Sequence, residues 1–306
     1  MTYFSVIIPC FNAAETLPQT LDSLRAQTYL GWEAICIDDG STDHTRTVVA
    51  HYAALDERIK LVRNIGKGPS RARNMVLMQR TATDVLAFCD ADDIWAPNKL
   101  AQLHFCFQSH SVDAAYGKIA FFTHKPSDAR TQSTVPESDL TIPMLLAENP
   151  VCTMSNLAVR AGVFQATDGF DEQMVHNEDL DWLIRLVGGG ARVVGLDILQ
   201  TYYRTNPRGL SSDLEAMRQG REAAIRTAKS FGFGVDDAAN AVYFRYLARR
   251  ALRLGGGSSA LKLALRGLAT SPAGFFSCPR RGMLTLGAAV CAAFFPAALS
   301  RYLFAH

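Results

Sequence analysis

Three acidic clusters contain the residues of this chain that are best suited to chemistry. They are Asp38-Asp39, Asp90-Ala91-Asp92-Asp93 and Glu178-Asp179-Leu180-Asp181. The first two each follow an apolar run typical of a buried strand, over residues 32–37 and 85–89. Residues that follow the strands of an open α/β sheet gather at the edge where nucleotides bind. We therefore expect these two clusters to share one site.

The cluster at residues 90–93 has the pattern of a divalent-metal site. Asp90 and Asp92 are one residue apart at a strand end, so both carboxylates can contact one hard ion such as magnesium or manganese. Such an ion bridges a diphosphate and neutralises charge on a departing nucleotide. A helix start favoured by the helix dipole is the simpler interpretation, but it accounts for Asp92 or Asp93 and not for Asp90.

The first cluster has two interpretations. Ser41 and Asp43, which follow Asp38-Asp39-Gly40, are residue types common at helix N-caps, so the segment could simply cap a helix. Alternatively, a carboxylate at a strand tip accepts hydrogen bonds from a base or a ribose. The residues alone leave both interpretations open.

A basic, glycine-containing loop separates these two clusters. Residues 64–74 join an expected strand to an expected helix, and Lys67, Arg71 and Arg73 could face a diphosphate at the start of that helix. The loop does not match G-x-x-x-x-G-K-[ST], which disfavours ATP hydrolysis of the P-loop kind. Each arginine could equally be a surface charge.

The third cluster begins an expected amphipathic helix that ends near Val187. Acidic residues at a helix start complement the dipole, and this accounts for one or two of the three carboxylates. The alternative is that Asp179 removes the proton from an attacking hydroxyl, which is a poor nucleophile until that proton leaves. Position alone does not separate Glu178, Asp179 and Asp181.

The elements that must position these residues alternate between strand and helix patterns. We expect strands at 4–8, 32–37, 59–62 and 85–89, with helices at 14–28, 41–55 and 70–79 between them. This rhythm predicts a mostly parallel, Rossmann-like sheet flanked by helices. Further on we expect a helix at 97–108, a strand at 114–122, a polar loop at 123–138, a strand at 153–159 and a strand at 192–196. After Arg204 the pattern is mainly helical, with a turn at 255–259.

The bulk composition is that of a globular protein large enough to bury a core. The chain has 306 residues, of which 48% are hydrophobic and 20% charged, and a net charge of +2 that gives no reason to expect nucleic acid. The seven cysteines contain no C-x-x-C pair, so a zinc site or disulfide framework is not expected. Free thiols and a strand starting at Phe4, which leaves no room for a secretory signal, predict a cytoplasmic protein.

With these motifs in order, the chain resembles a family-two glycosyltransferase with the GT-A fold, over roughly residues 4–215. The matching segments are Ser5–Asn12, Ile37–Asp43, Ala72–Asn74, Asp90–Asp93 with Pro97, Gly169–Glu172 and Asn177–Asp179. The resemblance implies residues 1–215 as a catalytic domain, with a nucleotide-sugar half at 1–112 and an acceptor half at 113–215. Residues 216–306 would be a helical extension.

The resemblance also implies roles for individual residues. Asp179 would be the general base, with Glu178 beside it, and Asp92 would hold the metal together with Asp90. Trp182, Asp181 and Arg204 would lie on the acceptor side. The nucleotide sugar, most commonly a UDP-sugar in this family, would contact Pro9, Phe11, Asn12, Glu15, Asp38, Asp39, Lys67, Arg71, Arg73, Asp90 and Ala91. The acceptor oxygen would displace the nucleotide in one inverting step, toward a saccharide or a lipid-linked acceptor.

Two departures from the family bear on processivity. Processive members carry a Gln-x-x-Arg-Trp run and several membrane-spanning helices, and this chain has neither. Tyr202-Tyr203-Arg204 followed by Ser211 is closer to the non-processive pattern. We therefore expect one sugar per encounter.

The C-terminal region could touch a membrane. Residues 245–281 contain eight Lys or Arg and no acidic residue, and residues 282–300 contain no charge at all. The second stretch could pack on the core, lie on the membrane or span it. Contact through residues 245–306 would place the protein at the inner face of the cell membrane.

Two functions of other classes remain as alternatives. A nucleotidyltransferase acting on sugar phosphates also uses paired carboxylates and a metal, but it usually has a glycine-rich loop after its first strand. Residues 9–15 contain no glycine. The other alternative is a catalytically silent saccharide-binding relative, which the three intact acidic clusters disfavour.

Overall fold

The computed structural model describes residues 1–78, 83–205, 213–294 and 296. It divides into two compact units, one formed by residues 1–140 with 150–205 and the other by residues 141–149 with 206–306. Segment 141–149, which sequence analysis assigns to the catalytic domain, thus groups with the helical part. Each unit is described below by itself.

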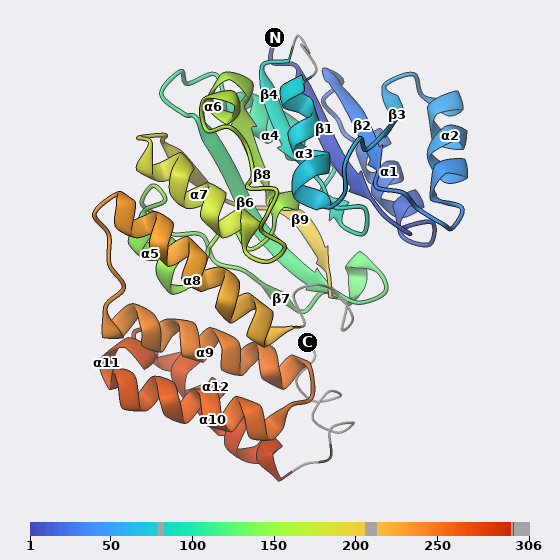
Figure 1. Cartoon of the computed structure of the whole chain (residues 1–306). Coiled ribbons are helices and arrows are strands. Elements are labelled where there is room, and N and C mark those ends of the chain that lie inside the picture. Colours follow the sequence, from blue (N-terminus) through green and yellow to red (C-terminus); the bar gives the residue numbers. More distant parts are fainter. Residues whose placement is uncertain (79–82, 206–212, 295, 297–306) are drawn as a thin grey trace. The chain divides into compact units, whose positions relative to one another are not determined.

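The first unit is built on one mixed sheet with the strand order β3-β2-β1-β4-β8-β6-β9-β5, and β7 pairs with β6 (Figure 1). Strands β3, β2, β1 and β4 run parallel, as expected, and β8 then pairs antiparallel with β4. The strands are β1 Phe4–Cys10, β2 Trp32–Asp38, β3 Ile59–Arg63, β4 Val85–Phe88, β5 Ile94–Trp95, β6 Ala114–Phe122, β7 Thr131–Gln132, β8 Leu157–Arg160 and β9 Val193–Arg204.

Helices cover both faces of this sheet because its central strands are apolar on both sides. On one face, leucines of α1 and α4 pack against Phe4, Val6 and Ile8 of β1. On the other face, Phe88 of β4 contacts Phe164, Phe170 and Trp182. The helices of this unit are α1 Leu17–Arg25, α2 Thr45–Leu55, α3 Pro69–Met78, α4 Lys99–Cys106, α6 Ala161–Ala166 and α7 Glu178–Gly188. The flanked α/β sheet predicted from sequence is therefore confirmed.

Two expected segments differ in detail. The strand expected at 153–159 begins only at Leu157, because residues 154–156 form a 3-10 turn after Cys152, whose φ is 70°. The expected loop at 123–138 contains a 3-10 turn, Pro126–Asp128, and the short strand β7.

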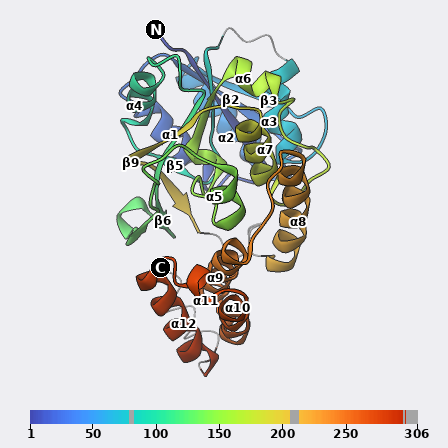
Figure 2. The same ribbon diagram turned by 90° about the vertical axis from the view of Figure 1, so that its left-hand side faces the viewer.

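The second unit is helical, as expected. Its helices are α5 Ile142–Ala147, α8 Leu214–Ser230, α9 Asp237–Arg253, α10 Gly257–Thr270, α11 Pro272–Phe275 and α12 Pro279–Ala293 (Figure 2). Helices α9, α10 and α12 pack around a core rich in alanine. Alanines and glycines let helix axes approach closely: a side chain at Gly257 would meet the backbone of Ala292.

Three arginines of this unit form ion pairs with one carboxylate. Glu148 pairs with Arg249 at 3.1 Å, and with Arg245 and Arg281 at 3.8 Å each. Within the described ranges, no helix is long and apolar enough to cross a membrane. Residues 295 and 297–300 of the expected membrane-contacting stretch, and Ser211, lie outside those ranges.

Candidate active site

The first two acidic clusters follow neighbouring strands. Asp38 is in register with Cys10 at the ends of β2 and β1, and the Asp39 amide donates to the Cys10 carbonyl at 2.8 Å. On the other side of β1, the Cys89 amide donates to the Ile7 carbonyl at 3.0 Å. Parallel pairing of β2, β1 and β4 therefore brings residues 38–39 and 90–93 to one sheet edge, as the sequence predicts.

Asp39 anchors the glycine-containing loop. Its carboxylate accepts hydrogen bonds from the Asn64 side chain at 2.6 Å and from the Gly68 amide at 2.9 Å. Gly68 has a φ of 97°, which glycine adopts without strain. The carboxylate retains further acceptor capacity, because it has about four lone-pair positions. Asp39 thus holds the loop and can still face a ligand.

Asp38 and Asn12 hold the turn that follows β2. Buried Asp38 accepts a hydrogen bond from the Ser41 amide at 3.1 Å. The Asn12 side chain accepts one from the Thr42 amide at 2.8 Å, and the Asn12 amide donates to the Ser41 hydroxyl at 3.1 Å. The capping-type interpretation of this segment therefore has direct contacts in its favour, and we assign Asp38 and Asn12 to positioning the turn.

Five other expected nucleotide-sugar residues differ in exposure. Phe11, Glu15 and Lys67 are exposed, Pro9 is half-buried, and neither Glu15 nor Lys67 has an ionic partner in the part of the chain that the structure describes. Ala91 is buried, and its carbonyl accepts a hydrogen bond from the Thr16 hydroxyl at 3.0 Å. Lys67 is therefore a cation that remains available for an anionic ligand.

Arg73 joins the second and third acidic clusters. Its guanidinium donates to Asp90 at 2.8 Å and to Glu178 at 3.1 Å, and the side chain is buried. Burial opposes the charged form, but the two carboxylates outweigh it and raise the pKa of Arg73. Two terminal nitrogens are thus committed to carboxylates. We therefore assign Arg73 to holding the acidic residues in place, and not to the diphosphate.

The loop before the third cluster is tied to α3. The Asn74 side chain both donates to and accepts from the backbone of Phe170, at 2.8 Å each, and Arg71 pairs with Glu172 at 2.7 Å. Gly169, with a φ of 67°, approaches so closely that a Cβ would lie 2.3 Å from the Asn74 side-chain oxygen. These contacts explain why the Ala72–Asn74 and Gly169–Glu172 motifs occur together.

Asp92 and Asp93 differ although they are adjacent. Burial and the neighbouring Asp90 raise the pKa of half-buried Asp92 to about 6, and its carboxylate has no hydrogen-bond partner among the residues described. Burial and the charges of Asp92 and Asp90 raise the pKa of Asp93 well above its usual range. Asp93 accepts a hydrogen bond from the Arg204 amide at 2.9 Å. Asp92 is thus the carboxylate available to a cation.

Arg204 braces the turn at residues 92–93. Its guanidinium donates to the carbonyls of Asp92 and His124 and to the Gln19 side chain, at 2.9, 3.2 and 2.7 Å. It also lies 4.5 Å from the centre of the Phe122 ring. Because these contacts occupy the guanidinium, we do not retain the expected acceptor-side role.

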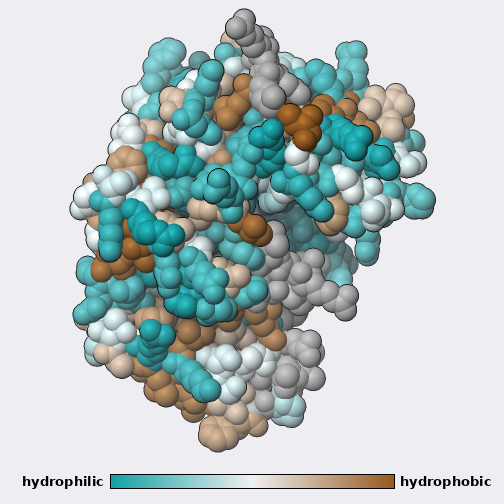
Figure 3. Space-filling view, in the orientation of Figure 1, coloured by the Kyte–Doolittle hydropathy of each residue, from teal (hydrophilic) through white to brown (hydrophobic). Residues whose placement is uncertain are grey.

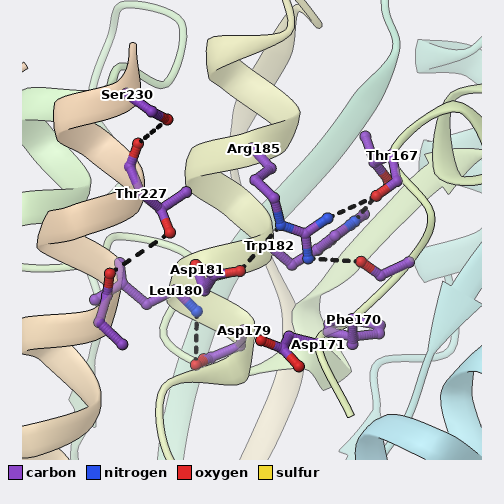
Figure 4. A network of polar contacts seen from close by, with 12 residues as sticks. Thr167, Phe170, Asp171, Asp179, Leu180, Asp181, Trp182, Arg185, Thr227 and Ser230 are labelled. Carbon is purple, nitrogen blue, oxygen red and sulfur yellow. Dashed lines mark hydrogen bonds and ion pairs between the residues drawn. The ribbon is translucent and has the colours of Figure 1, made fainter. Parts of the chain in front are cut away.

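Asp179 is in the first turn of α7, where it accepts a hydrogen bond from the Leu180 amide at 2.8 Å (Figure 4). Burial raises its pKa to about 7, and the charges of Glu178 and Asp90 act in the same direction. Arg73 opposes the shift. A carboxyl group with this pKa is suited to exchange a proton near neutral pH. The negative charge of Asp90 thus raises the pKa of both Asp92 and Asp179.

The other two expected residues of α7 are structural. Asp181 pairs with Arg185 at 3.0 Å, and Arg185 donates to the carbonyls of Thr167 and Gly169 at 2.6 Å each (Figure 4). Trp182 is completely buried, and its indole N–H donates to the Thr167 hydroxyl at 2.9 Å. The prediction that Trp182 contacts an acceptor is therefore wrong, because helical periodicity points its ring into the core.

Two residues in contact with Asp90, and a lysine that contacts one of them, are not anticipated from sequence. Ser155 accepts a hydrogen bond from the Asp90 amide at 2.8 Å, and the Thr153 hydroxyl contacts the Asp90 carboxylate at 3.3 Å. Lys99 is fully buried, donates to the Ser155 carbonyl at 2.6 Å, and burial lowers its pKa to about 7. Serine and threonine before a strand carry no distinctive signal. A lysine in a predicted helix, such as Lys99, is normally interpreted as an exposed surface charge.

In the described ranges, no group of three or more His, Cys, Asp or Glu side chains forms a ready metal site. Asp90 and Asp92 could supply at most two carboxylate ligands to an ion, and Asp90 is already paired with Arg73. An ion bound here would have to complete its shell with oxygens from elsewhere, as magnesium sites commonly do with substrate phosphates and water.

Comparison with known proteins shows the family to which this chain belongs. A family model described as "Glycosyl transferase family 2" matches residues 5–167. The Escherichia coli protein named "UDP-Glc:alpha-D-GlcNAc-diphosphoundecaprenol beta-1,3-glucosyltransferase WfgD" is 30% identical over 213 residues, covering 68% of this chain and 79% of that protein. The Bacillus subtilis "Putative glycosyltransferase EpsE" is 27% identical, covering 76% of this chain and 78% of that protein.

Solved structures share the fold at low sequence identity. Staphylococcus aureus TarS 1-349 in complex with UDP-GlcNAc has a TM-score of 0.62 at 18% identity, covering 99% of this chain and 89% of that chain. The mannosyltransferase PcManGT from Pyrobaculum calidifontis, in complex with GDP-Man and Mn2+, has a TM-score of 0.57 at 19% identity, with 98% and 86% covered. This chain spans 54% of a longer TarS chain.

Proposed function

This chain belongs to glycosyl transferase family 2 and has the GT-A fold, and from that premise we propose that it moves one sugar per encounter from a nucleoside-diphosphate sugar to an acceptor hydroxyl. We further propose a UDP-sugar as the donor, inversion at the anomeric carbon, and Asp179 as the general base. A saccharide or lipid-linked saccharide would be the acceptor.

The contact of Arg73 with both Asp90 and Glu178 is the single observation that carries the proposal. It connects the strand-end cluster, which suits a nucleotide diphosphate, to the helix that carries a proton acceptor. The pKa of that acceptor, Asp179, is about 7, so a useful fraction is deprotonated at neutral pH. Neither a nucleotidyltransferase nor a silent binding protein needs this base.

The relatives support the substrate classes. WfgD is named for a UDP-glucose donor and a diphosphoundecaprenol-linked acceptor, and the TarS structure contains UDP-GlcNAc. On that basis we propose UDP as the leaving group and a lipid-linked saccharide as the acceptor. Exposed Lys67, with Asp39 beside the same loop, would contact the donor.

The residues present fit a divalent cation. Asp92 has a raised pKa because its charge is poorly solvated and is repelled by Asp90, and a bound cation would relieve both costs. Asp92 would hold the ion with Asp90, and magnesium or manganese would supply charge neutralisation of the departing diphosphate. PcManGT was solved with Mn2+.

The protein's own residues account for the proton and the geometry. Asp179 takes the proton of the acceptor hydroxyl as the oxygen forms its bond to the anomeric carbon. The bond from that carbon to the diphosphate breaks with its electron pair, which the nucleoside diphosphate keeps. Arg73 keeps Glu178 and Asp90 at fixed positions, so the helix start and the strand end stay in register. One displacement inverts the anomeric centre.

Transfer can be tested with UDP-sugars, manganese and a short-chain polyprenyl-diphosphate saccharide, by measuring UDP release and the product's anomeric configuration by NMR. We expect acceptor-dependent UDP release and an inverted linkage. Retained configuration would exclude the single-displacement mechanism. The absence of nucleoside-diphosphate release from every UDP- and GDP-sugar tested would contradict the proposal as a whole.

A further inference from the structure

Helix α12 of the second unit has an apolar side that faces outward. The exposed fractions of four side chains at helical spacing are 62% for Met283, 64% for Leu284, 43% for Val290 and 83% for Phe294. The opposite side, with Gly282, Thr285, Ala289 and Ala292, is buried. We call the four exposed residues the α12 stripe. Figure 3 shows hydrophobic surface among the helices of this unit.

This arrangement differs from that of an ordinary surface helix. Single exposed apolar side chains are common, but an aligned set leaves a continuous apolar strip in water. A surface helix normally places charged residues on its outer side and apolar residues toward the core. Helix α12 packs inward with small residues and places its large apolar residues outward. The stripe therefore requires an apolar partner.

The charges around the stripe indicate what that partner is. Residues 238–306 contain no Asp or Glu, whereas they contain nine Lys or Arg. Arg280 begins the outward side of α12, and Lys262 and Arg266 are exposed on α10, which packs against α12. The apolar strip thus begins next to Arg280 in a segment without Asp or Glu, and Glu148, which approaches α12, is paired with Arg281. Such a strip complements a surface of anionic lipids.

We propose that the α12 stripe, together with Lys262 and Arg280, docks the protein onto an anionic lipid surface. The large apolar side chains would enter the boundary between headgroups and acyl chains, and the basic side chains would contact lipid phosphates. A second copy of the chain is a poorer partner. A symmetric dimer would pair the stripe with itself and bring the same basic residues face to face.

The inference rests on the proposed function in one respect, since a lipid-linked acceptor gives the docking a purpose. It is tested by flotation of the full chain with vesicles of phosphatidylcholine alone or with 30% phosphatidylglycerol, a composition chosen for the assay. The test variant is Leu284→Ser with Phe294→Ser. Its matched control is Leu30→Ser with Phe105→Ser, two residues of the first unit that are 70% and 81% exposed.

We expect the wild type and the control to bind only the anionic vesicles, and the stripe variant to bind at least tenfold less. Arg280→Gln with Lys262→Gln should also weaken binding, as should 0.5 M salt, because salt screens exposed charges. Equal binding by the stripe variant and the control would overturn the inference. So would a wild type that ignores anionic vesicles, or one that binds only after residues 297–306 are removed.

Two further measurements separate the remaining outcomes. A wild-type dimer that becomes monomeric in the stripe variant, measured by analytical ultracentrifugation, would assign the stripe to a second copy and overturn the docking. Transfer to a water-soluble acceptor requires no vesicle. If the wild type does not dock but still transfers sugar to the water-soluble acceptor, the docking inference fails and the proposed function stands. If it docks but transfers no sugar, the proposed function fails and the docking inference stands.

Discussion

The buried guanidinium of Arg73, on α3, lies 2.8 Å from the half-buried carboxylate of Asp90 at the end of β4. The same guanidinium reaches Glu178 at the start of α7, at 3.1 Å. One buried cation thus holds two carboxylates whose segments are about ninety residues apart in sequence. Without it, they would repel each other in a poorly solvated environment.

Arg73→Met should therefore destabilise the first unit. Removing Arg73 leaves two partly solvated carboxylates without their cation, which costs about 1–3 kcal/mol. Urea denaturation should show a lower midpoint. Arg71→Met is the matched control, because the Arg71–Glu172 pair is partly exposed and such pairs contribute about 0–1 kcal/mol. Similar losses in the two variants would contradict the assigned role of Arg73.

Asp179→Asn should mainly lower turnover. The amide is nearly isosteric but cannot accept the proton, and general-base catalysis contributes about 10²–10⁴-fold. Steady-state kinetics should show kcat reduced by at least about 100-fold with the donor KM little changed. Asp181→Asn is the comparison, since that residue holds Arg185. A larger kcat loss in Asp181→Asn, with Asp179→Asn near wild type, would move the base to position 181.

The pH profile of kcat/KM should report the same group. Burial raises the pKa of Asp179 to about 7, and only the deprotonated form can act as a base. The value of kcat/KM should therefore rise with pH up to about 7, as Asp179 loses its proton, and level off above it. A fall in kcat/KM over this range is not expected. Initial rates across a series of buffers check this. A wild-type plateau that extends unchanged down to about pH 5 would show that a different group removes the proton.

Asp92→Ala should weaken the binding of UDP in the presence of manganese. Asp92 belongs to the proposed metal pair and has no hydrogen-bond partner within the described ranges, so we expect at least about tenfold lower affinity by calorimetry. Since its pKa is about 6, wild-type affinity should also fall below that pH, as protons compete with the metal. Asp197→Ala is the control, because Asp197 is a surface residue paired with Lys118. Unchanged affinity in Asp92→Ala would remove this residue from the metal site.

Trp182→Ala should cost stability rather than acceptor affinity. The indole is fully buried against Phe88, Phe164 and Phe170, and truncating such a ring costs about 3–5 kcal/mol. Thermal unfolding should occur at a lower temperature, while the acceptor KM of the remaining folded enzyme stays near the wild-type value. A raised acceptor KM without lost stability would restore the acceptor contact expected from sequence.

The sequence by itself determined the three acidic clusters and the alternation of the longer strands and helices in the first unit, but not the short elements β5, β7 and α6 or the extension of β9 to Arg204. Apolar runs and helical periodicity are local patterns; the first two clusters follow a strand directly and the third begins a helix. Family membership could be anticipated for the same reason, because the motifs occur in a specific order. The predicted start of a strand at residue 153 is wrong, because a 3-10 turn occupies residues 154–156 and the strand begins at Leu157.

Only the tertiary structure decided which carboxylates are free and which are used. Asp92 and Asp93 are neighbours in sequence, yet Arg204, far along the chain, bonds to the Asp93 carboxylate, whereas the Asp92 carboxylate has no hydrogen-bond partner among the described residues. Trp182 and Asp179 are three residues apart on one helix, and packing buries one in the core while the other accepts only a local amide. Lys99 and Ser155 support Asp90 through long-range contacts. Such assignments depend on burial and on partners distant in sequence, which residue type and spacing do not encode.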